Sequence, residues 1–210
     1  MGKLKAGING SIQGKVGNVV GASWKGIDYI RAAPRKRTGK PGKNEKANRN
    51  KFGDAHRWLK PVLDFVRQGF KGYTSTVEGF IAAKSYLLLN AFEGKAPGMT
   101  INPALVSVSF GTLPLSNDIA VEKTKSNQLT FSWDTSPVED GSPADQVMLL
   151  AYDIEHEVAY FTITGQFRSA GSDILEIDGR KGRIYHIYLA FTADDRSRQS
   201  NSVYLGTVKV

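Results

Sequence analysis

Cysteine is absent from the 210-residue sequence, so disulfide bonds, thiolate metal sites and cysteine nucleophiles are excluded. Histidine is scarce, and His56, His156 and His186 lack the spacing of a metal-binding pair. No nucleophile elbow, P-loop or dinucleotide-binding fingerprint occurs. The carboxylates of Asp153, Glu155 and Glu157 are too few for a Ca²⁺ site, which needs six or more oxygen ligands. We therefore predict a protein that is not an enzyme and has no cofactor or metal.

Long apolar runs are also missing. The longest are residues 86–89 and 147–152, far shorter than the roughly 20 residues that cross a bilayer as a helix. Met1–Lys5 continue into a polar, glycine-rich segment and not into the apolar core of a secretory signal. We expect a protein synthesised in the cytoplasm without a signal peptide, with no membrane span, and either particle-associated or released. No small-molecule substrate is evident.

Acidic residues are rare in the first half of the chain. Residues 1–100 contain 19 Lys+Arg and 6 Asp+Glu, whereas residues 101–210 contain 9 and 14. This asymmetry indicates two parts that face different partners, or one part that docks onto the other in a neighbouring copy. The residues expected to contact a nucleic acid or an acidic partner are Arg35, Lys36, Arg37, Lys40 and Lys43.

Glycine recurs through the first 33 residues. A helix there is disfavoured, because each interior glycine destabilises a helix by about 1 kcal/mol relative to alanine. We predict a β-hairpin with arms at 16–24 and 27–32 around Lys25-Gly26. Close backbone approach, between strands or between subunits, accounts for the glycines at 14, 17 and 21. The residues expected at an assembly interface are Val16, Val19, Val20, Trp24, Tyr29 and Arg31.

Residues 34–43 form a basic connector in which two prolines exclude a regular helix. Apolar residues at steps of three and four then predict a helix from Asn44, kinked at Pro61 and ended by Gly69. Ser75 and Glu78 have capping-box spacing, which predicts a second helix that ends near Gly94.

From Ile101 onward, apolar residues alternate with polar ones, which is typical of strands. Eight short strands separated by turn clusters predict an antiparallel sandwich. The predicted strands are residues 105–110, 119–122, 129–133, 146–153, 157–164, 173–177, 183–193 and 202–208.

Two segments of this region resemble a fibronectin type III domain. They are Leu129-Thr-Phe-Ser-Trp133 and Tyr185-His-Ile-Tyr-Leu-Ala190, the second running on to residues 200–203. In that fold a tryptophan of strand B packs in the core, and a tyrosine followed by alternating apolar residues marks strand F. The resemblance implies that Trp133, Tyr185, Ile187 and Leu189 are core residues of such a sandwich.

The N-terminal half resembles an uncharacterised bacterial family of domains of unknown function that also occurs in phage-associated proteins. The motifs are Gly14-Lys-Val-Gly-Asn-Val-Val-Gly21, Trp24-Lys-Gly26 and Tyr29-Ile-Arg31. The helix start departs from the family pattern, since Lys43-Asn-Glu-Lys-Ala-Asn-Arg49 stands where relatives often have Asn-Pro-x-Thr-x-x-Gln. The family implies no activity, but it favours an assembly or particle-associated role.

The predicted fold class is α+β: an N-terminal β-hairpin and a two-helix unit, then an antiparallel fibronectin type III/immunoglobulin-like β-sandwich, with divisions 1–43, 44–98 and 99–210. The leading functional prediction is a self-associating structural protein of a phage-like particle, filament or surface assembly. Its glycine- and valine-rich arm would add a strand to a neighbour's sheet. The alternatives are a nucleic-acid-binding protein that uses the basic half, and a carbohydrate- or ligand-binding sandwich that uses loops 136–143, 165–172 and 194–201.

Overall fold

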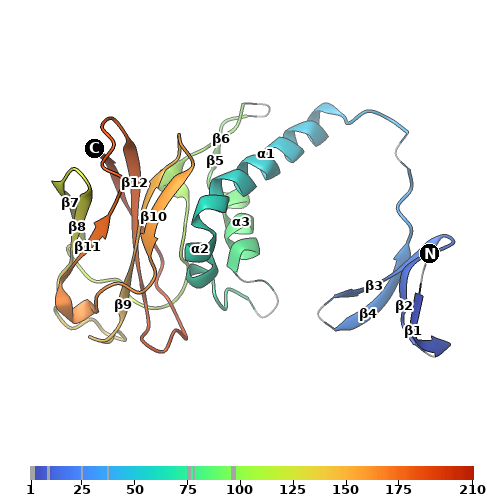
Figure 1. Ribbon diagram of the computed structural model, residues 1–210, viewed down its shortest axis with the longest axis horizontal. Helices are drawn as coiled ribbons and strands as arrows, with labels where there is room; N and C mark the ends of the chain where they lie inside the picture. Colours follow the sequence, from blue (N-terminus) through green and yellow to red (C-terminus); the bar gives the residue numbers. More distant parts are fainter. Residues whose placement is uncertain are drawn as a thin grey trace. The chain divides into compact units, whose positions relative to one another are not determined.

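The computed structural model divides the chain into two compact units, Met1–Gly42 and Lys43–Val210 (Figure 1). The described residues are 3–8, 10–24, 26–36, 38–74, 77, 79–95 and 98–210.

The N-terminal unit is a four-stranded antiparallel sheet with the order β1-β2-β3-β4 (Figure 1). Its last two strands pair from Val19 opposite Ala32 to Trp24 opposite Ile27, which confirms the predicted hairpin. Lys25, in the predicted turn, lies outside the described residues. The strands are β1 (Lys3–Ile8), β2 (Ile12–Val16), β3 (Val19–Trp24) and β4 (Ile27–Ala32).

The predicted first arm of this hairpin starts too early. Val16 is the last residue of β2, and a turn at Gly17 and Asn18 separates it from β3. Gly17 has a φ of +56°, which glycine adopts without the steric cost that a Cβ would add. Gly21 lies where two backbones approach, since a Cβ on it would be 1.7 Å from the carbonyl oxygen of Ile12. The glycines therefore allow β2 to lie close against β3.

The second unit begins with the predicted helices. Helix α1 (Lys43–Leu59) is followed by a 3-10 turn, η1 (Lys60–Val62), and by α2 (Leu63–Gly69). Pro61 lies in this turn and has no amide hydrogen for a helical bond, which accounts for the predicted kink. Helix α3 (Gly79–Asn90) follows, and the predicted capping residues Ser75 and Glu78 lie outside the described residues.

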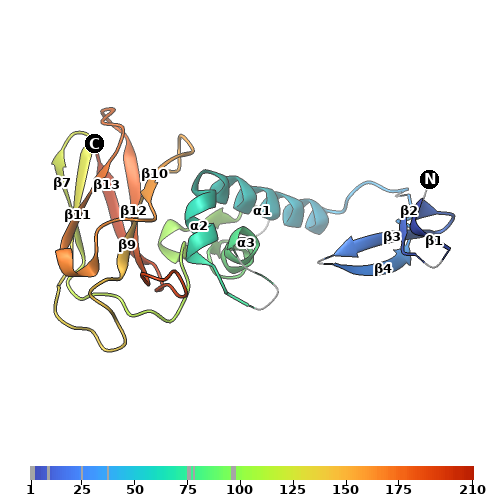
Figure 2. The ribbon, with the colours of Figure 1, turned by 60° about the horizontal axis from the view of Figure 1, so that its bottom comes forward.

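Seven strands form the predicted sandwich from two antiparallel sheets, with orders β11-β8-β7 and β10-β9-β12-β13 (Figure 2). The strands are β7 (Ala120–Lys125), β8 (Gln128–Ser132), β9 (Gln146–Asp153), β10 (Val158–Thr162), β11 (Ser172–Glu176), β12 (Ile184–Thr192) and β13 (Val203–Lys209).

One predicted strand is wrong. Residues 105–110 follow a 3-10 turn, η2 (Pro103–Leu105), and form no strand. The side chain of Asn102 accepts a hydrogen bond from the amide of Ala104 and thereby starts this turn. A short ribbon of β5 (Phe92–Glu93) and β6 (Thr100–Ile101), which the sequence analysis did not predict, lies between α3 and the turn.

In the second unit, the sheet β10-β9-β12-β13 is covered on both faces, by the helices on one side and by the three-stranded sheet on the other (Figure 2). On β12, Ile187 and Leu189 pack with Phe131 of the second sheet, whereas Tyr188 packs in the cluster that contains Phe65 of α2. Both clusters consist only of residues from the second unit. Residues 43–210 therefore contain complete hydrophobic cores, and we expect them to fold without the first unit.

Candidate interaction sites

The net positive charge of the chain belongs entirely to the first unit. Residues 1–42 contain nine Lys+Arg and one acidic residue, Asp28, whereas residues 43–210 contain 19 Lys+Arg and 19 Asp+Glu. The acidic half that the sequence suggested is therefore balanced by basic helices within its own unit. The net charge of +8 belongs to residues 1–42 as a whole and gives this unit a strongly positive electrostatic potential.

The sheet of the first unit exposes apolar side chains on both faces. Residues directly opposite each other in an antiparallel pair share a face. Trp24 and Ile27 therefore lie on one face, and Ile30, opposite Gly21, lies on the other. Their exposed fractions are 56%, 67% and 58%, so more than half of each side chain is in contact with water.

The predicted assembly residues divide between these two faces. On the face of Trp24 lie Val20, Tyr29 and Arg31, and on the other face lie Val16 and Val19, which are opposite each other in β2 and β3. All six are at least partly exposed. Ile27 and Ile30 were not among the predicted interface residues, although both belong to β4, as Tyr29 and Arg31 do.

Strand β4 is the last strand of its sheet, so within this sheet it pairs on one side only. All six of its residues are exposed. The outer edge of such a strand presents main-chain donors and acceptors that pair readily with a strand of another molecule.

The basic residues of the connector and the start of α1 are also accessible. Arg35, Lys36, Lys40 and Lys43 are exposed, and Arg37 lies outside the described residues. They follow directly on β4 in the chain, so the exposed strand and the cationic segment are continuous.

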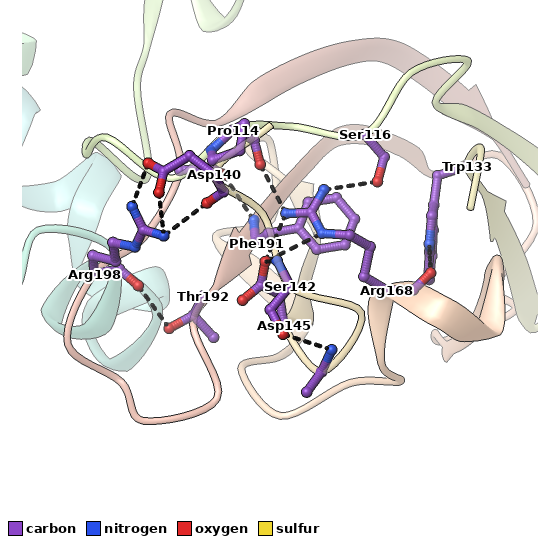
Figure 3. A network of polar contacts seen from close by, with 12 residues as sticks. Pro114, Ser116, Trp133, Asp140, Ser142, Asp145, Arg168, Phe191, Thr192 and Arg198 are labelled. Carbon is purple, nitrogen blue, oxygen red and sulfur yellow. Dashed lines mark hydrogen bonds and ion pairs between the residues drawn. The ribbon is translucent and has the colours of Figure 1, made fainter. Parts of the chain in front are cut away.

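At one end of the sandwich, a buried arginine joins loops that are distant in sequence (Figure 3). The Arg168 side chain is 4% exposed, and its Nε donates to Oδ2 of Asp145 at 3.2 Å. Its other nitrogens donate to Oγ of Ser116 and the carbonyl oxygen of Pro114, both at 2.8 Å. The guanidinium lies 4.1 Å from the ring centre of Phe191. Burial lowers the pKa of Arg168, and Asp145 opposes that shift.

The three loops proposed for ligand binding meet at this end and bind one another. Arg168 belongs to loop 165–172, while Arg198 of loop 194–201 forms two hydrogen bonds with the carboxylate of Asp140, at 2.6 and 3.1 Å. Asp140 belongs to loop 136–143 (Figure 3). These charged side chains connect the loops and are already paired, so this cluster stabilises the sandwich.

A pocket of about 620 Å³ lies at the opposite end of β9, where α1, the β5–β6 ribbon, the β9–β10 turn and β12 meet. Trp58 and Tyr152, both buried, form its floor with their rings 5.0 Å apart and edge to face. The pocket is lined by Asp54, Arg57, Trp58, Phe92, Met99, Thr100, Ile101, Pro103, Tyr152, Ile154, Glu155, Glu157, Ile184 and His186.

The carboxylates near this pocket differ in their partners. Asp153 is buried, and its Oδ2 is 2.8 Å from Nδ1 of His156 and accepts a hydrogen bond from Arg183 at 3.2 Å. Glu155 and Glu157 are exposed at the pocket. Among the described residues, no group of three or more histidine, aspartate and glutamate side chains is arranged to hold a metal ion.

His186, in the pocket wall, gives a prediction of pH dependence. Burial lowers the pKa of His186 below its ordinary value of 6.5, and the negative charge of Asp153 partly opposes the shift. The unfolded chain therefore binds a proton more readily than the folded chain, and stability decreases as the pH falls below about 6.5. Between pH 7 and pH 5.5, His186→Gln is expected to lose less of its free energy of unfolding than the unaltered protein in urea titrations. The exposed His56→Gln is the control, and equal losses in all three proteins would contradict the prediction.

The chain thus combines a small, strongly basic sheet with a β-sandwich that is covered by helices on one face. Within the part of the chain that is described, no helix has the length and apolarity needed to cross a membrane. The family model described as "Family of unknown function (DUF6266)" matches residues 11–206, and the chain belongs to this family. No curated protein and no solved structure matches the chain.

Proposed function

We propose that the chain is a non-enzymatic structural protein that self-associates as a component of a phage-like particle, filament or surface assembly. The N-terminal unit is the association element. The observation that carries this proposal is the sheet of residues 3–32, which exposes large apolar side chains on both faces and has an exposed edge strand. Association that removes such apolar surface from water lowers the free energy of the system.

The proposed contact is strand addition at β4 combined with burial of one apolar face. Main-chain hydrogen bonds along β4 would provide affinity, and Trp24, Ile27 and Tyr29 would fill the interface beside them. Asp28 and Arg31 are the two charged residues of this strand. The connector would attract an acidic surface and accelerate encounter without fixing the register.

We further propose that the N-terminal half has bacterial or phage-associated relatives, and that the sandwich is of the fibronectin type III-like kind. The second is supported by Trp133, which is 5% exposed, and by Tyr185, near the start of β12. The hydroxyl of Tyr185 donates to the carbonyl oxygen of Asp178, seven residues upstream, at 2.9 Å. A tyrosine that bonds back to the main chain in this way is a hallmark of immunoglobulin-like sandwiches.

Nucleic-acid binding is the second candidate function. It is favoured by the concentration of the whole net charge, +8, in 42 residues that also expose Trp24 and Tyr29. Lysine and arginine contacts to phosphates would make the affinity fall steeply with salt, and the exposed rings would stack on bases.

Removal of residues 1–42 is expected to abolish self-association and to leave the second unit folded. The full chain should have a mass above 23.0 kDa in light scattering, and the chain that begins at Lys43 should be a monomer with an unchanged thermal transition. Nuclease treatment before the measurement separates the two candidate functions, because a complex held together by nucleic acid would dissociate.

A full-length variant with Arg35, Lys36, Arg37 and Lys40 changed to glutamine serves as the control. It retains the sheet and removes the charge of the connector, so it should still associate. The proposal is wrong if the chain lacking residues 1–42 forms the same assembly as the full chain, or if the full chain is monomeric after nuclease treatment.

A further inference from the structure

The pocket between α1, the β5–β6 ribbon and the β9–β10 turn has no part in the proposed association, because all of its lining residues belong to the second unit. Its walls above the buried floor are apolar. Ile101 and Ile154 are partly buried, and Ile184 is 47% exposed. A ligand in this pocket therefore covers aliphatic surface with at least part of its length.

The mouth of the pocket is negatively charged. Asp54, Glu155 and Glu157 contribute three carboxylates, and Arg57 contributes one guanidinium. Arg57 lies 3.3 Å from Asp54 and 3.9 Å from Glu157, so its charge is shared between two of the carboxylates. His186 is neutral at pH 7, because burial lowers its pKa. The lining residues thus have a net charge of −2, in a unit whose overall charge is zero, and Lys51, over the ring of Phe92, offsets one of these charges.

An aromatic ring at this site already attracts a cation. The Nζ atom of Lys51, one turn before Asp54 on α1, lies 4.8 Å from the ring centre of Phe92. Burial raises the pKa of Tyr152, and the negative charges of Glu157 and Asp153 raise it further. The position of Lys51 over the Phe92 ring and the effect of these two carboxylates on Tyr152 both indicate that the site disfavours negative charge.

We propose that this pocket binds the side chain of an arginine or lysine from a peptide segment. The aliphatic stem of such a residue packs on Ile154 and Ile184, while its charged end reaches Glu155 and Glu157 at the mouth. An anionic ligand is repelled by the carboxylates, and a small inorganic cation leaves the apolar walls in contact with water.

The test is a titration of the full-length protein with Nα-acetyl-arginine amide, followed by NMR. The indole N–H of Trp58 is a suitable reporter, because Nε1 is buried in the floor and has no hydrogen-bond partner among the described residues. We expect saturable shifts of this signal that weaken as salt is added. The neutral citrulline analogue, which has the same stem and shape, should produce no comparable shift.

Two double variants with the same change in net charge test whether the arginine amide binds at this pocket. Glu155→Gln with Glu157→Gln should weaken binding about tenfold, the effect of two exposed charge contacts of typical strength. Glu122→Gln with Glu176→Gln, on exposed positions of β7 and β11 in the other sheet, should leave the affinity unchanged. The proposal is overturned if the citrulline analogue binds equally well, if both double variants behave alike, or if no saturable shift occurs at low salt.

The source of the cation is identified with the full-length variant in which Arg35, Lys36, Arg37 and Lys40 are glutamine. If the connector of this protein supplies the side chain, that variant should bind the free arginine amide more tightly, because a competitor has been removed. Unchanged affinity shows that these four residues do not supply the cation, and both results retain the pocket as a cation site. Binding of the amide does not require self-association, since all lining residues of the pocket belong to one chain.

Discussion

Replacement of Arg168 by methionine is expected to destabilise the sandwich by about 3–5 kcal/mol, the usual effect of breaking a buried ion pair by removing one partner. Methionine fills much of the space of the arginine stem but makes none of its hydrogen bonds. It leaves the carboxylate of Asp145, which is 1% exposed, without its charged partner. It also removes the donors to Ser116 and Pro114, which hold the segment before β7 (Figure 3).

The neighbouring pair of Arg198 and Asp140 provides a matched control. It has a closer contact, 2.6 Å, but the two side chains are 37% and 66% exposed. Water solvates both charges after the pair is broken, so Arg198→Met should shift the urea midpoint much less than Arg168→Met. Equal shifts for the two variants would show that burial does not determine the contribution of these arginines.

A second variant separates lost pairing from lost packing. When Asp145→Asn is added to Arg168→Met, no unpaired charge remains in the interior, and part of the lost stability should return. The amide of Ser142 donates to Asp145 at 2.8 Å, and the asparagine oxygen is able to accept that bond. A double variant that is less stable than Arg168→Met would mean that the charge of Asp145 is compensated by other groups.

The strands of the sandwich could be predicted from the sequence because each has a strong local pattern. Residues 146–153 were predicted with the bounds that β9 has in the structure. Residues 105–110, before the sandwich, were wrongly predicted to form a strand, because apolar and polar residues alternate there as well. There the side chain of Asn102 and the ring of Pro103 favour a 3-10 turn, and local hydrogen bonding prevails over apolar periodicity.

The arrangement of layers was harder to infer, although a signal exists. Seven of the eight residues of β9, from Val147 to Asp153, are buried, whereas a strand with one solvent-exposed face alternates. A nearly continuous buried run indicates a central strand covered on both sides, here by helices and by a second sheet. Separate charge counts for residues 1–100 and 101–210 did not indicate that the helices pack on the sheet. They assigned the basic helices and the acidic strands to different parts of the chain.

The pocket could not have been predicted from the sequence. Its residues come from α1, from a ribbon that was not predicted, and from β9, the β9–β10 turn and β12, which follow much later in the chain. No periodicity or spacing links Asp54 to Glu157 and Ile184, since their proximity results from packing of the helices on the sheet. The N-terminal sheet differs, because pairing within a single hairpin places Val20, Trp24 and Tyr29 on one face.

Substitution of Gly21 by alanine is expected to disrupt the N-terminal sheet without altering the charge of the chain. The added Cβ would lie 1.7 Å from the carbonyl oxygen of Ile12 and 2.5 Å from its carbonyl carbon, so β2 would have to leave its place beside β3. Overpacking costs about 1–3 kcal/mol even in cores that are able to relax, and a backbone atom cannot move aside as a flexible side chain can. Amides of residues 12–32 should lose protection in hydrogen exchange, while those of β9 and β12 keep theirs.

This variant tests the folded sheet, and not its charge, as the element of self-association. Gly42→Ala is the control, because a Cβ at that position meets no atom within 4 Å. If the folded sheet is required, Gly21→Ala should be monomeric in light scattering and Gly42→Ala should assemble as the unaltered chain does. Assembly of a Gly21→Ala chain whose residues 12–32 have lost protection would show that the cationic segment associates without its sheet. In that case the apolar faces and the β4 edge would not be the basis of the assembly.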